Sequence, residues 1–374
     1  MGECGQDGCG GYCPPCHTGD PKAPWSCDQH WTLCDETTRT CVPMERICGP
    51  CSDASSLCDR QKLDCEAAEA AVPLADCSGG WCRVQGGVSF VMGGPDGGEG
   101  KEWGGPGVNY ENSYPRHPVV LTRGFEIMQT EVTTKAWLEV MGTATAPTRY
   151  PACGSDCPVS MGTFFDVLAF ANRASQKSGY KPCYVLEGCN SPAEGWKLEC
   201  ERAIFVGPDC GGYRLPSEAE FELAAGAGVT SCFPNGCALW GLANCAPEED
   251  VSKMAWFCGN SAVGYEGCKD CSSIGGTGPR GPPCCGPHPV GQKEPNAFGL
   301  LDVIGNVVEF TGTLKADHHE GLAVDPGFDT VINQPVIWKG GSYSSTDTNA
   351  CVGRRNGIRL DFEGVDAGGV GFRP

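Results

Sequence analysis

Cys351 lies in "WKGGSYSSTDTNACVGRR", residues 338 to 355, among small polar residues. It follows a Gly-Gly-Ser turn and precedes two arginines, Arg354 and Arg355. A cysteine in such a loop can be a nucleophilic thiolate, a ligand of a soft metal ion or half of a disulfide. The guanidinium groups would lower the pKa of a thiol, but arginine cannot accept its proton, and no histidine is near in sequence. A catalytic role would therefore need a base from another part of the fold.

Two short clusters contain other ligand residue types. Cys13, Cys16 and His17 form "CPPCH", which matches the C-x-x-C-H attachment site of haem c, and residues 317–320 form "DHHE". One such match is expected by chance among so many cysteines, and two prolines separate the thiols. We therefore interpret the first cluster as part of a disulfide framework rather than a haem c site, with four-cysteine zinc binding left open. The second has no known spacing of iron ligands, so we interpret it as a solvated loop.

The composition indicates an oxidising compartment. The chain has 374 residues, of which 28 are cysteine, 55 glycine and 29 proline. A cytosol would keep so many thiols reduced, so we expect an extracytoplasmic protein that is secreted, periplasmic or anchored at the cell surface. The formal net charge of −19 argues against nucleic acid or an anionic membrane as partner. No run approaches the ~20 apolar residues of a transmembrane segment.

The distribution of cysteines divides the chain. Thirteen of the 28 fall within residues 1–82, which we predict to be a separate disulfide-rich module before a main domain at 83–374. Its opening, "ECGQDGCGGYCPPC", resembles modules at the surface-exposed ends of bacterial exported proteins. The counts of 13 and 15 on the two sides are both odd, so complete pairing requires a disulfide across the boundary. Cys77 and Cys82 are the nearest candidates.

Strand and helix signals alternate after the boundary. Residues 88–94 have the short apolar run and glycines of a strand and turn. Residues 124–142 begin as a strand and continue as a short helix with Thr133 or Thr134 as its N-cap. Residues 163–179 carry apolar side chains at helical spacing and end in glycine. This alternation predicts an α+β domain.

Later signals predict one further helix and a long loop. Ser217 and Glu220 form a capping box after a proline, so we expect a buried helix to begin there. Residues 267–291 are rich in glycine, proline and cysteine. The neighbours Cys284 and Cys285 are too close in the chain for an ordinary disulfide, so each needs a partner elsewhere.

Seven motifs follow one another in the main domain. They are "GGVSFVMGG", "TEVTTKAWLEVMG", "PVSMGTFFDVLAFANRAS", "GYRLPSEAEFELAAGAG", "NAFGLLDVIGNVVEFT", "KGGSY" and "GFRP". In this order they resemble the sulfatase-modifying-factor, or formylglycine-generating-enzyme, family. The resemblance runs from about residue 84 to residue 374. It implies a compact, loop-rich α+β fold related to C-type lectins, in which we expect the terminal "GVGFRP" to be a central strand or strand-like segment.

The resemblance also bears on activity. Members that oxidise a substrate cysteine to formylglycine carry two cysteines after the Gly-Gly-Ser turn and hold copper(I) between them. Here Ser345 and Ala350 occupy those two positions, with Cys351 one residue later. Serine does not ligate copper(I), so the incomplete pair argues against copper and against this enzymatic activity. Iron-using members bring histidines from an added helical domain, which residues 1–82 do not resemble.

Calcium is the cofactor that the resemblance favours. The family binds it through the positions matched by Asp302, Gly305, Val307 and Glu309, with backbone carbonyls at the middle two. Calcium requires several oxygen ligands, and a glycine lets the backbone close around the ion. The alternative is that the two acidic residues only cap a turn. A second calcium site of the family, in the region matched by residues 243–265, is not recognisable here.

These observations favour a non-catalytic recognition domain at the cell surface, for an unknown protein, peptide or glycan ligand. Small polar and aromatic residues give adaptable hydrogen bonding in binding loops. The alternatives are a metal- and oxygen-dependent oxidase that uses Cys351 and a structural surface protein. The expected ligand-binding loop comprises Tyr343, Ser344, Ser345, Asp347, Asn349, Arg354 and Arg355.

Overall fold

The computed structural model describes most of the chain after residue 74 and one strand pair before it. The described residues are 32–35, 40–43, 75–93, 117–193, 195–229, 233–234, 244–246, 249–276, 278–315, 322–327, 331–332, 334–346, 350–358 and 369–374. In the N-terminal region, β1 (Thr32–Asp35) pairs antiparallel with β2 (Thr40–Pro43). The residues predicted for haem and the "DHHE" cluster lie outside the described residues.

A four-stranded sheet lies at the centre, with β10 (Val308–Leu314) as an inner strand. β10 pairs antiparallel with β13 (Val336–Lys339) and parallel with β15 (Val370–Gly371), and β14 (Asn356–Ile358) lies beyond β13. β15, predicted as a central strand or strand-like segment, is a two-residue strand at the edge of this sheet. Its residues are nevertheless buried, because residues 160 and 161 cover that edge through a hydrogen bond and a bridge to Val370.

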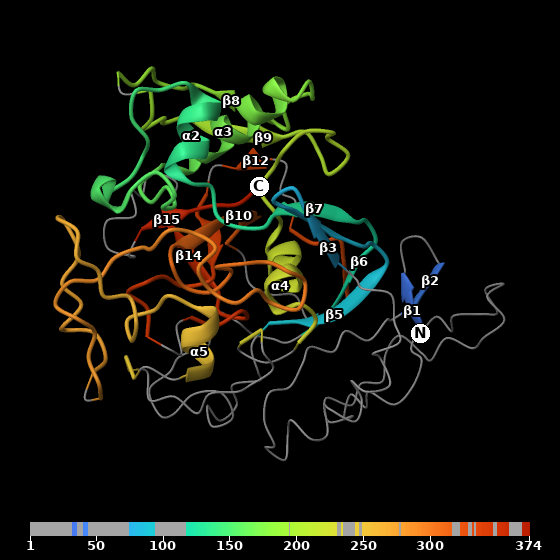
Figure 1. Ribbon diagram of the computed structural model, residues 1–374. Coiled ribbons are helices and arrows are strands. Elements are labelled where there is room, and N and C mark those ends of the chain that lie inside the picture. The colour runs from blue at the N-terminus through green and yellow to red at the C-terminus, as the bar shows by residue number, and fades with distance from the viewer. Residues whose placement is uncertain are drawn as a thin grey trace, which may run out of the picture.

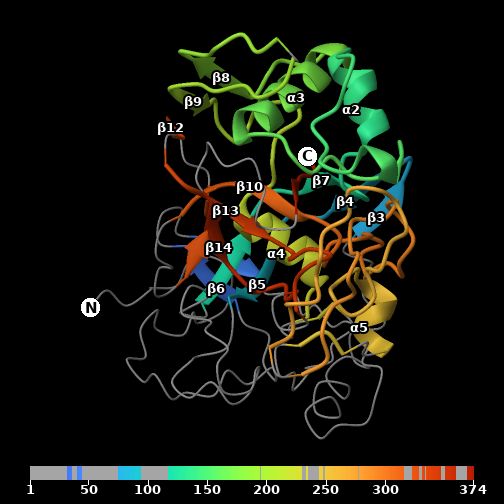
Figure 2. The same ribbon diagram turned by 90° about the vertical axis from the view of Figure 1, so that its left-hand side faces the viewer.

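Three helices pack against the two faces of this sheet: α2 (Thr134–Met141), α3 (Phe164–Lys177) and α4 (Glu218–Gly226). Figures 1 and 2 show α2 and α3 on one side of the sheet and α4 on the other. Phe164 of α3 packs edge to face on Phe310 of β10, with ring centroids 5.4 Å apart. The short elements η2 (Pro151–Cys153) and α5 (Glu249–Met254) complete the helical part of the described chain.

The helix signals in the sequence are confirmed. The Thr133 side chain caps α2, and the Thr163 and Ser217 side chains each form a capping box, with Asp166 and Glu220 as partners. Each box satisfies two backbone N–H groups that a helix start leaves without partners. α4 is buried over all nine residues, including three glutamates, so its charges must be compensated within the fold.

Three small sheets surround the centre. They contain β3 (Ala75–Ser78), β4 (Trp81–Val84) and β7 (Phe125–Met128); β5 (Val88–Met92), β6 (His117–Leu121) and β11 (Ala323–Val324); and β8 (Tyr184–Glu187), β9 (Arg202–Phe205) and β12 (Val331–Ile332). The described part of the chain is thus an α+β fold of short strands, as predicted. None of its helices is long and apolar enough to cross a membrane.

The disulfide pairing in the β3–β4 hairpin differs from the pairing predicted from the sequence. Cys77 and Cys82 bond to each other across the hairpin, and β4 pairs with β7 of the main domain. The prediction that Cys77 or Cys82 forms the disulfide across the boundary to the main domain is therefore wrong. The predicted boundary between residues 82 and 83 falls inside β4, so the sheet structure of the main domain includes residues from 75 onward.

Disulfides hold the loops where regular structure is sparse. Cys284 and Cys285 bond to Cys268 and Cys271, respectively, so each reaches elsewhere as expected. The other described pairs outside the hairpin are Cys153–Cys157, Cys183–Cys210, Cys189–Cys200 and Cys245–Cys258. Cross-links of this kind compensate for the few backbone hydrogen bonds of loops by restricting the unfolded chain.

We predict that Gly212→Ala destabilises the fold and that Gly211→Ala does not. A Cβ at Gly212 would lie 2.2 Å from the Lys181 carbonyl oxygen, whereas a Cβ at Gly211 would meet nothing within 4 Å. Overpacking against fixed backbone should lower the free energy of unfolding by about 1–3 kcal/mol, measured by denaturant unfolding. Equal losses in the two variants would contradict the close approach of these backbones.

Candidate functional site

The turn after β13 is tightly bonded within itself. The Ser342 N–H donates to Ser345 Oγ at 2.9 Å, and the Ser345 N–H donates to the Ser342 carbonyl oxygen at 2.9 Å. The Ser345 carbonyl in turn accepts from the Cys258 N–H at 3.0 Å. Ser345 occupies the position of a copper-binding cysteine in the family, and here its hydrogen bonds stabilise the backbone of a turn.

Tyr343 belongs to the core rather than to a binding surface. Its side chain is buried, its hydroxyl hydrogen-bonds to that of Tyr150, and the two rings meet edge to face. Its backbone is held too, since the Tyr343 N–H donates to the Asn306 carbonyl and the Tyr343 carbonyl accepts from Ser261 Oγ at 2.7 Å. Tyr343, predicted as a ligand contact, thus anchors the start of the loop.

Cys351 is a half-cystine. It is disulfide-bonded and 1% exposed, and its partner cysteine lies outside the described residues. It packs in the apolar core with its neighbours Ala350 and Val352 and with Phe257. A disulfide sulfur is neither a thiolate nucleophile nor a copper(I) ligand.

Arg355, at the other end of the loop, is buried in an ion-pair network under α4. Its Nε donates to both oxygens of Glu218 at 2.9 Å. Lys339 contacts Glu222 at 2.7 Å and Glu218 at 3.6 Å. Each buried charge has an opposite partner, so the network compensates two of the glutamates of α4. Arg355, predicted as a ligand contact, is therefore occupied by an internal contact.

The middle of the predicted loop differs from its ends. Ser344, Ser345 and Arg354 are half-buried at the edge of the fold, while Asp347 and Asn349 lie outside the described residues. Of the described loop residues, Tyr343 and Arg355 are therefore buried, and Ser344, Ser345 and Arg354 are partly exposed.

The expected calcium position is part of a buried charge cluster. Arg373 donates from Nε and Nη2 to the two oxygens of Glu309 at 2.7 and 2.6 Å. Its Nη2 also lies 4.0 Å from Glu131, which sequence analysis did not single out. Asp302 accepts from the Gly291 N–H at 2.6 Å. Three buried carboxylates thus surround one guanidinium.

Burial shifts the pKa values of all three carboxylates in this cluster. Burial, Asp302 and Glu309 raise the pKa of Glu131 well above its ordinary value, and Arg373 opposes them. Burial is also the main cause that raises the pKa of Asp302 and of Glu309. Among the described residues, both oxygens of Glu131 and Oδ1 of Asp302 are buried without a hydrogen-bond partner. Such oxygens carry a desolvation cost that a proton or a cation would relieve.

The donor set at this position suits a hard cation. Oδ1 of Asp302 is available, and each Glu309 oxygen that accepts from Arg373 keeps a further lone pair. No group of three or more histidine, cysteine or acidic side chains that could hold a metal ion occurs in the described ranges. A calcium ion here would therefore depend on two carboxylates with backbone carbonyls, which is the expected set of Asp302, Gly305, Val307 and Glu309.

Comparisons with known proteins agree on the family. Residues 78–373 match the family described as "Sulfatase-modifying factor enzyme 1-like domain". The chain is 30% identical over 211 residues to "Chaperone protein LppX" of Paenibacillus barcinonensis, covering 55% of this chain and 68% of that protein. It is 35% identical over 115 residues to the formylglycine-generating enzyme of Mycobacterium tuberculosis, covering 31% of each.

A solved structure shares the fold. "Treponema denticola variable protein 1" superimposes with a TM-score of 0.55 at 24% identity, covering 81% of this chain and 98% of that one. At this identity the likeness concerns the fold alone.

We predict that Arg373→Met costs about 3–5 kcal/mol of unfolding free energy, because it leaves buried carboxylates without their cation. Arg83→Met is the control, since the Arg83–Glu126 ion pair is exposed and should contribute about 1 kcal/mol or less. Denaturant unfolding of both variants measures the difference. Similar losses in the two would show that the buried guanidinium is not a central support.

Proposed function

Because the chain belongs to the sulfatase-modifying factor enzyme 1-like family, we propose that it is an extracytoplasmic recognition domain that keeps the family fold without formylglycine-generating activity. The observation that carries this proposal is the state of Cys351, whose sulfur is buried in a disulfide. Ser345 and Ala350 stand where the family's copper ligands are expected, and the Ser345 N–H and hydroxyl form hydrogen bonds within the turn. No described thiolate is thus available to hold copper(I) at this turn.

Location outside the cytoplasm is supported by the cross-links. Six of the seven described disulfides tie segments that have little regular structure, the seventh crosses the β3–β4 hairpin, and such bonds persist in oxidising compartments. These disulfides suit an oxidising compartment, and a function in binding needs no reduced thiol.

Calcium is proposed as a structural ion of this domain. Asp302 and Glu309 would hold it with the carbonyls of Gly305 and Val307, and it would supply positive charge to a cluster of three carboxylates and one guanidinium. Oδ1 of Asp302, buried without a donor, supports this assignment. The ion would stiffen the segment between the Asp302 turn and β10, on which the central sheet depends.

The absence of activity can be tested directly. The protein is incubated with copper(I), oxygen, a reductant and a peptide carrying the sulfatase-type cysteine motif, with a formylglycine-generating enzyme as positive control. We expect no aldehyde by mass spectrometry. A parallel unreduced sample treated with an alkylating reagent should show no modification at Cys351. Aldehyde formation that disappears in Cys351→Ser would instead establish the oxidase.

Calcium dependence has a separate readout. Chelation should lower the melting temperature of the wild-type protein, since a ligand at 100 times its Kd stabilises the fold by about 2.7 kcal/mol. In Asp302→Ala the difference between chelated and calcium-loaded samples should vanish, whereas the exposed Asp209→Ala control should retain it. A wild-type protein with the same melting temperature in both conditions would refute the site.

A further inference from the structure

A pocket of about 730 Å³ lies between the β4 and β7 strands and the loop that leads into α4. Its volume falls in the range of sites for small molecules. None of its lining residues comes from the predicted loop at residues 343–355, nor from the charge cluster at Asp302. It is therefore a separate surface of the same domain.

Three aromatic side chains form one wall of the pocket. Trp81 stacks on Tyr213 with centroids 5.2 Å apart and an interplanar angle of 25°, and Tyr180 meets Tyr213 edge-on at 6.0 Å. Trp81 and Tyr213 are half-buried, and the Tyr180 residue is 52% exposed. An exposed aromatic beside two others presents flat apolar surface to solvent, which is costly unless something covers it.

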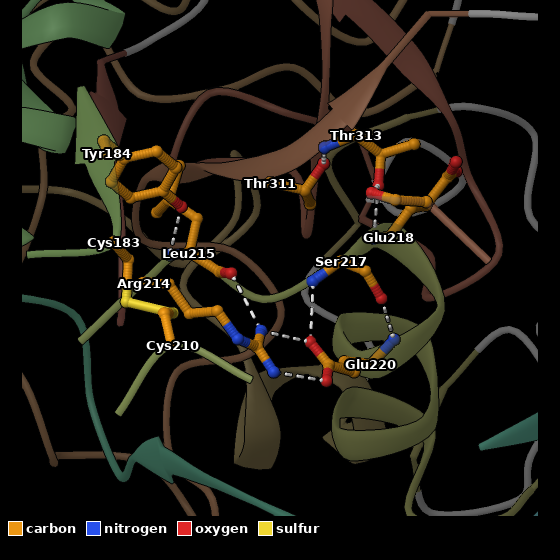
Figure 3. A network of polar contacts seen from close by, with 11 residues as sticks. Cys183, Tyr184, Cys210, Arg214, Leu215, Ser217, Glu218, Glu220, Thr311 and Thr313 are labelled. Carbon is orange, nitrogen blue, oxygen red and sulfur yellow. Dashed lines mark hydrogen bonds and ion pairs between the residues drawn. A yellow bond between two sulfur atoms is a disulfide. The ribbon is translucent and has the colours of Figure 1, made fainter. Parts of the chain in front are cut away.

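Polar groups of the pocket occur as two Arg–Glu pairs. Arg83 and Glu126 are opposite one another on β4 and β7, and the Arg83 Nη2 contacts a Glu126 oxygen at 2.7 Å. Arg214 contacts both oxygens of Glu220 at 2.7 and 2.8 Å (Figure 3). These are the charged side chains of the described pocket lining, and they sum to zero. An uncharged ligand fits this balance.

The two ion pairs differ in solvent exposure. The Arg83–Glu126 side chains are 75% and 52% exposed, so a ligand can exchange with their hydrogen bonds at little cost. The Arg214–Glu220 pair is largely buried. Arg214 also donates to the Leu215 carbonyl, and Glu220 accepts from the Ser217 N–H at 2.8 Å (Figure 3). The exposed Arg83–Glu126 pair suits contact with ligand hydroxyls, while the buried Arg214–Glu220 pair holds the pocket wall in place.

The walls of the pocket are held in place by tight backbone contacts. A Cβ at Gly86 would lie 2.4 Å from the Gly124 nitrogen, so only a residue without a side chain fits where these two pocket-lining segments cross. On the opposite side, the Cys183–Cys210 disulfide fixes the loop before Tyr213 (Figure 3). A pocket with such fixed walls loses little conformational entropy on binding.

We propose that this pocket binds a neutral carbohydrate. The C–H face of a pyranose ring packs on aromatic rings such as those of Trp81 and Tyr180, because the ring face carries negative charge density and the sugar C–H groups are slightly positive. Adjacent sugar hydroxyls can hydrogen-bond to both side chains of the outer ion pair, because the Arg83 guanidinium donates and the Glu126 carboxylate accepts. A proline-rich peptide also packs on aromatic rings but has no hydroxyl pairs for these two side chains. The inference names a ligand class for the proposed recognition function.

The test uses the full chain on an array of immobilised neutral and acidic glycans and proline-rich peptides, followed by titration calorimetry with the glycan bound best. We expect binding to a neutral glycan that weakens about tenfold in Tyr180→Ala, which corresponds to about 1.4 kcal/mol. The pair Arg83→Gln with Glu126→Gln should weaken it similarly. The control is Val206→Ala, because Val206 is equally exposed (53%) and lies outside the pocket.

Unchanged melting temperatures in these exposed variants exclude a folding defect. Glycan binding that is equal in wild type and pocket variants would overturn the pocket while leaving a recognition function. Binding only to acidic glycans or peptides, or to nothing on the array, would overturn the carbohydrate assignment. The aldehyde assay above separately decides whether the domain is catalytic, so the two failures are distinguishable.

Discussion

The buried guanidinium of Arg373 is the contact on which most of this fold depends. Besides the two oxygens of Glu309 on β10, it donates to the carbonyls of Met128, Gln129 and Leu301. One side chain near the C-terminal end thus ties the central sheet, the segment after β7 and the loop before the Asp302 turn. Met128 is the last residue of β7, and Gln129 and Leu301 lie outside the strands. Without the guanidinium, these carbonyls would each lose a hydrogen bond, although Gln129 would still accept from the Leu301 N–H.

Buried ion pairs also connect α4 to the rest of the fold. Lys339 and Arg355 neutralise Glu218 and Glu222, and Arg214 neutralises Glu220 on the remaining side. A helix buried all round is ordinarily apolar, but this one joins β13, the pocket and the C-terminal loop through charged side chains. The fold therefore gains its connections from a few directional contacts and disulfides rather than from long strands and helices.

Local signals in the sequence predicted the helices well, since the capping residues Thr163 and Ser217 act within one turn. The role of Cys351 also followed, because an even number of cysteines in an oxidising compartment leaves few thiols over. Glu131 and Arg373 lie inside motifs that identified the family, yet their pairing spans more than two hundred residues, which no local pattern reveals. The burial of Tyr343 has a related origin: its polar neighbours indicate a surface, and only tertiary packing on Tyr150 places the side chain in the interior.

The Cys77–Cys82 disulfide has a local signal in the sequence. Two glycines separate Ser78 from Trp81, and Gly-Gly between strands is typical of a two-residue hairpin that brings its flanking residues together. The odd cysteine counts on the two sides of the predicted boundary favour a disulfide across it, whereas this hairpin signal favours the local pair. The pocket was not predictable, since its walls come from β4, β7 and the loop before α4, which meet only in the folded chain.

The disulfides of the neighbouring cysteines 284 and 285 have a consequence for proteolysis. Their two disulfides, to Cys268 and Cys271, enclose the glycine- and proline-rich stretch between residues 271 and 284. Exposed loops of this composition are where secreted proteases cut first. A cut anywhere in that stretch would leave the two pieces joined by both bonds, so the domain could be nicked without coming apart.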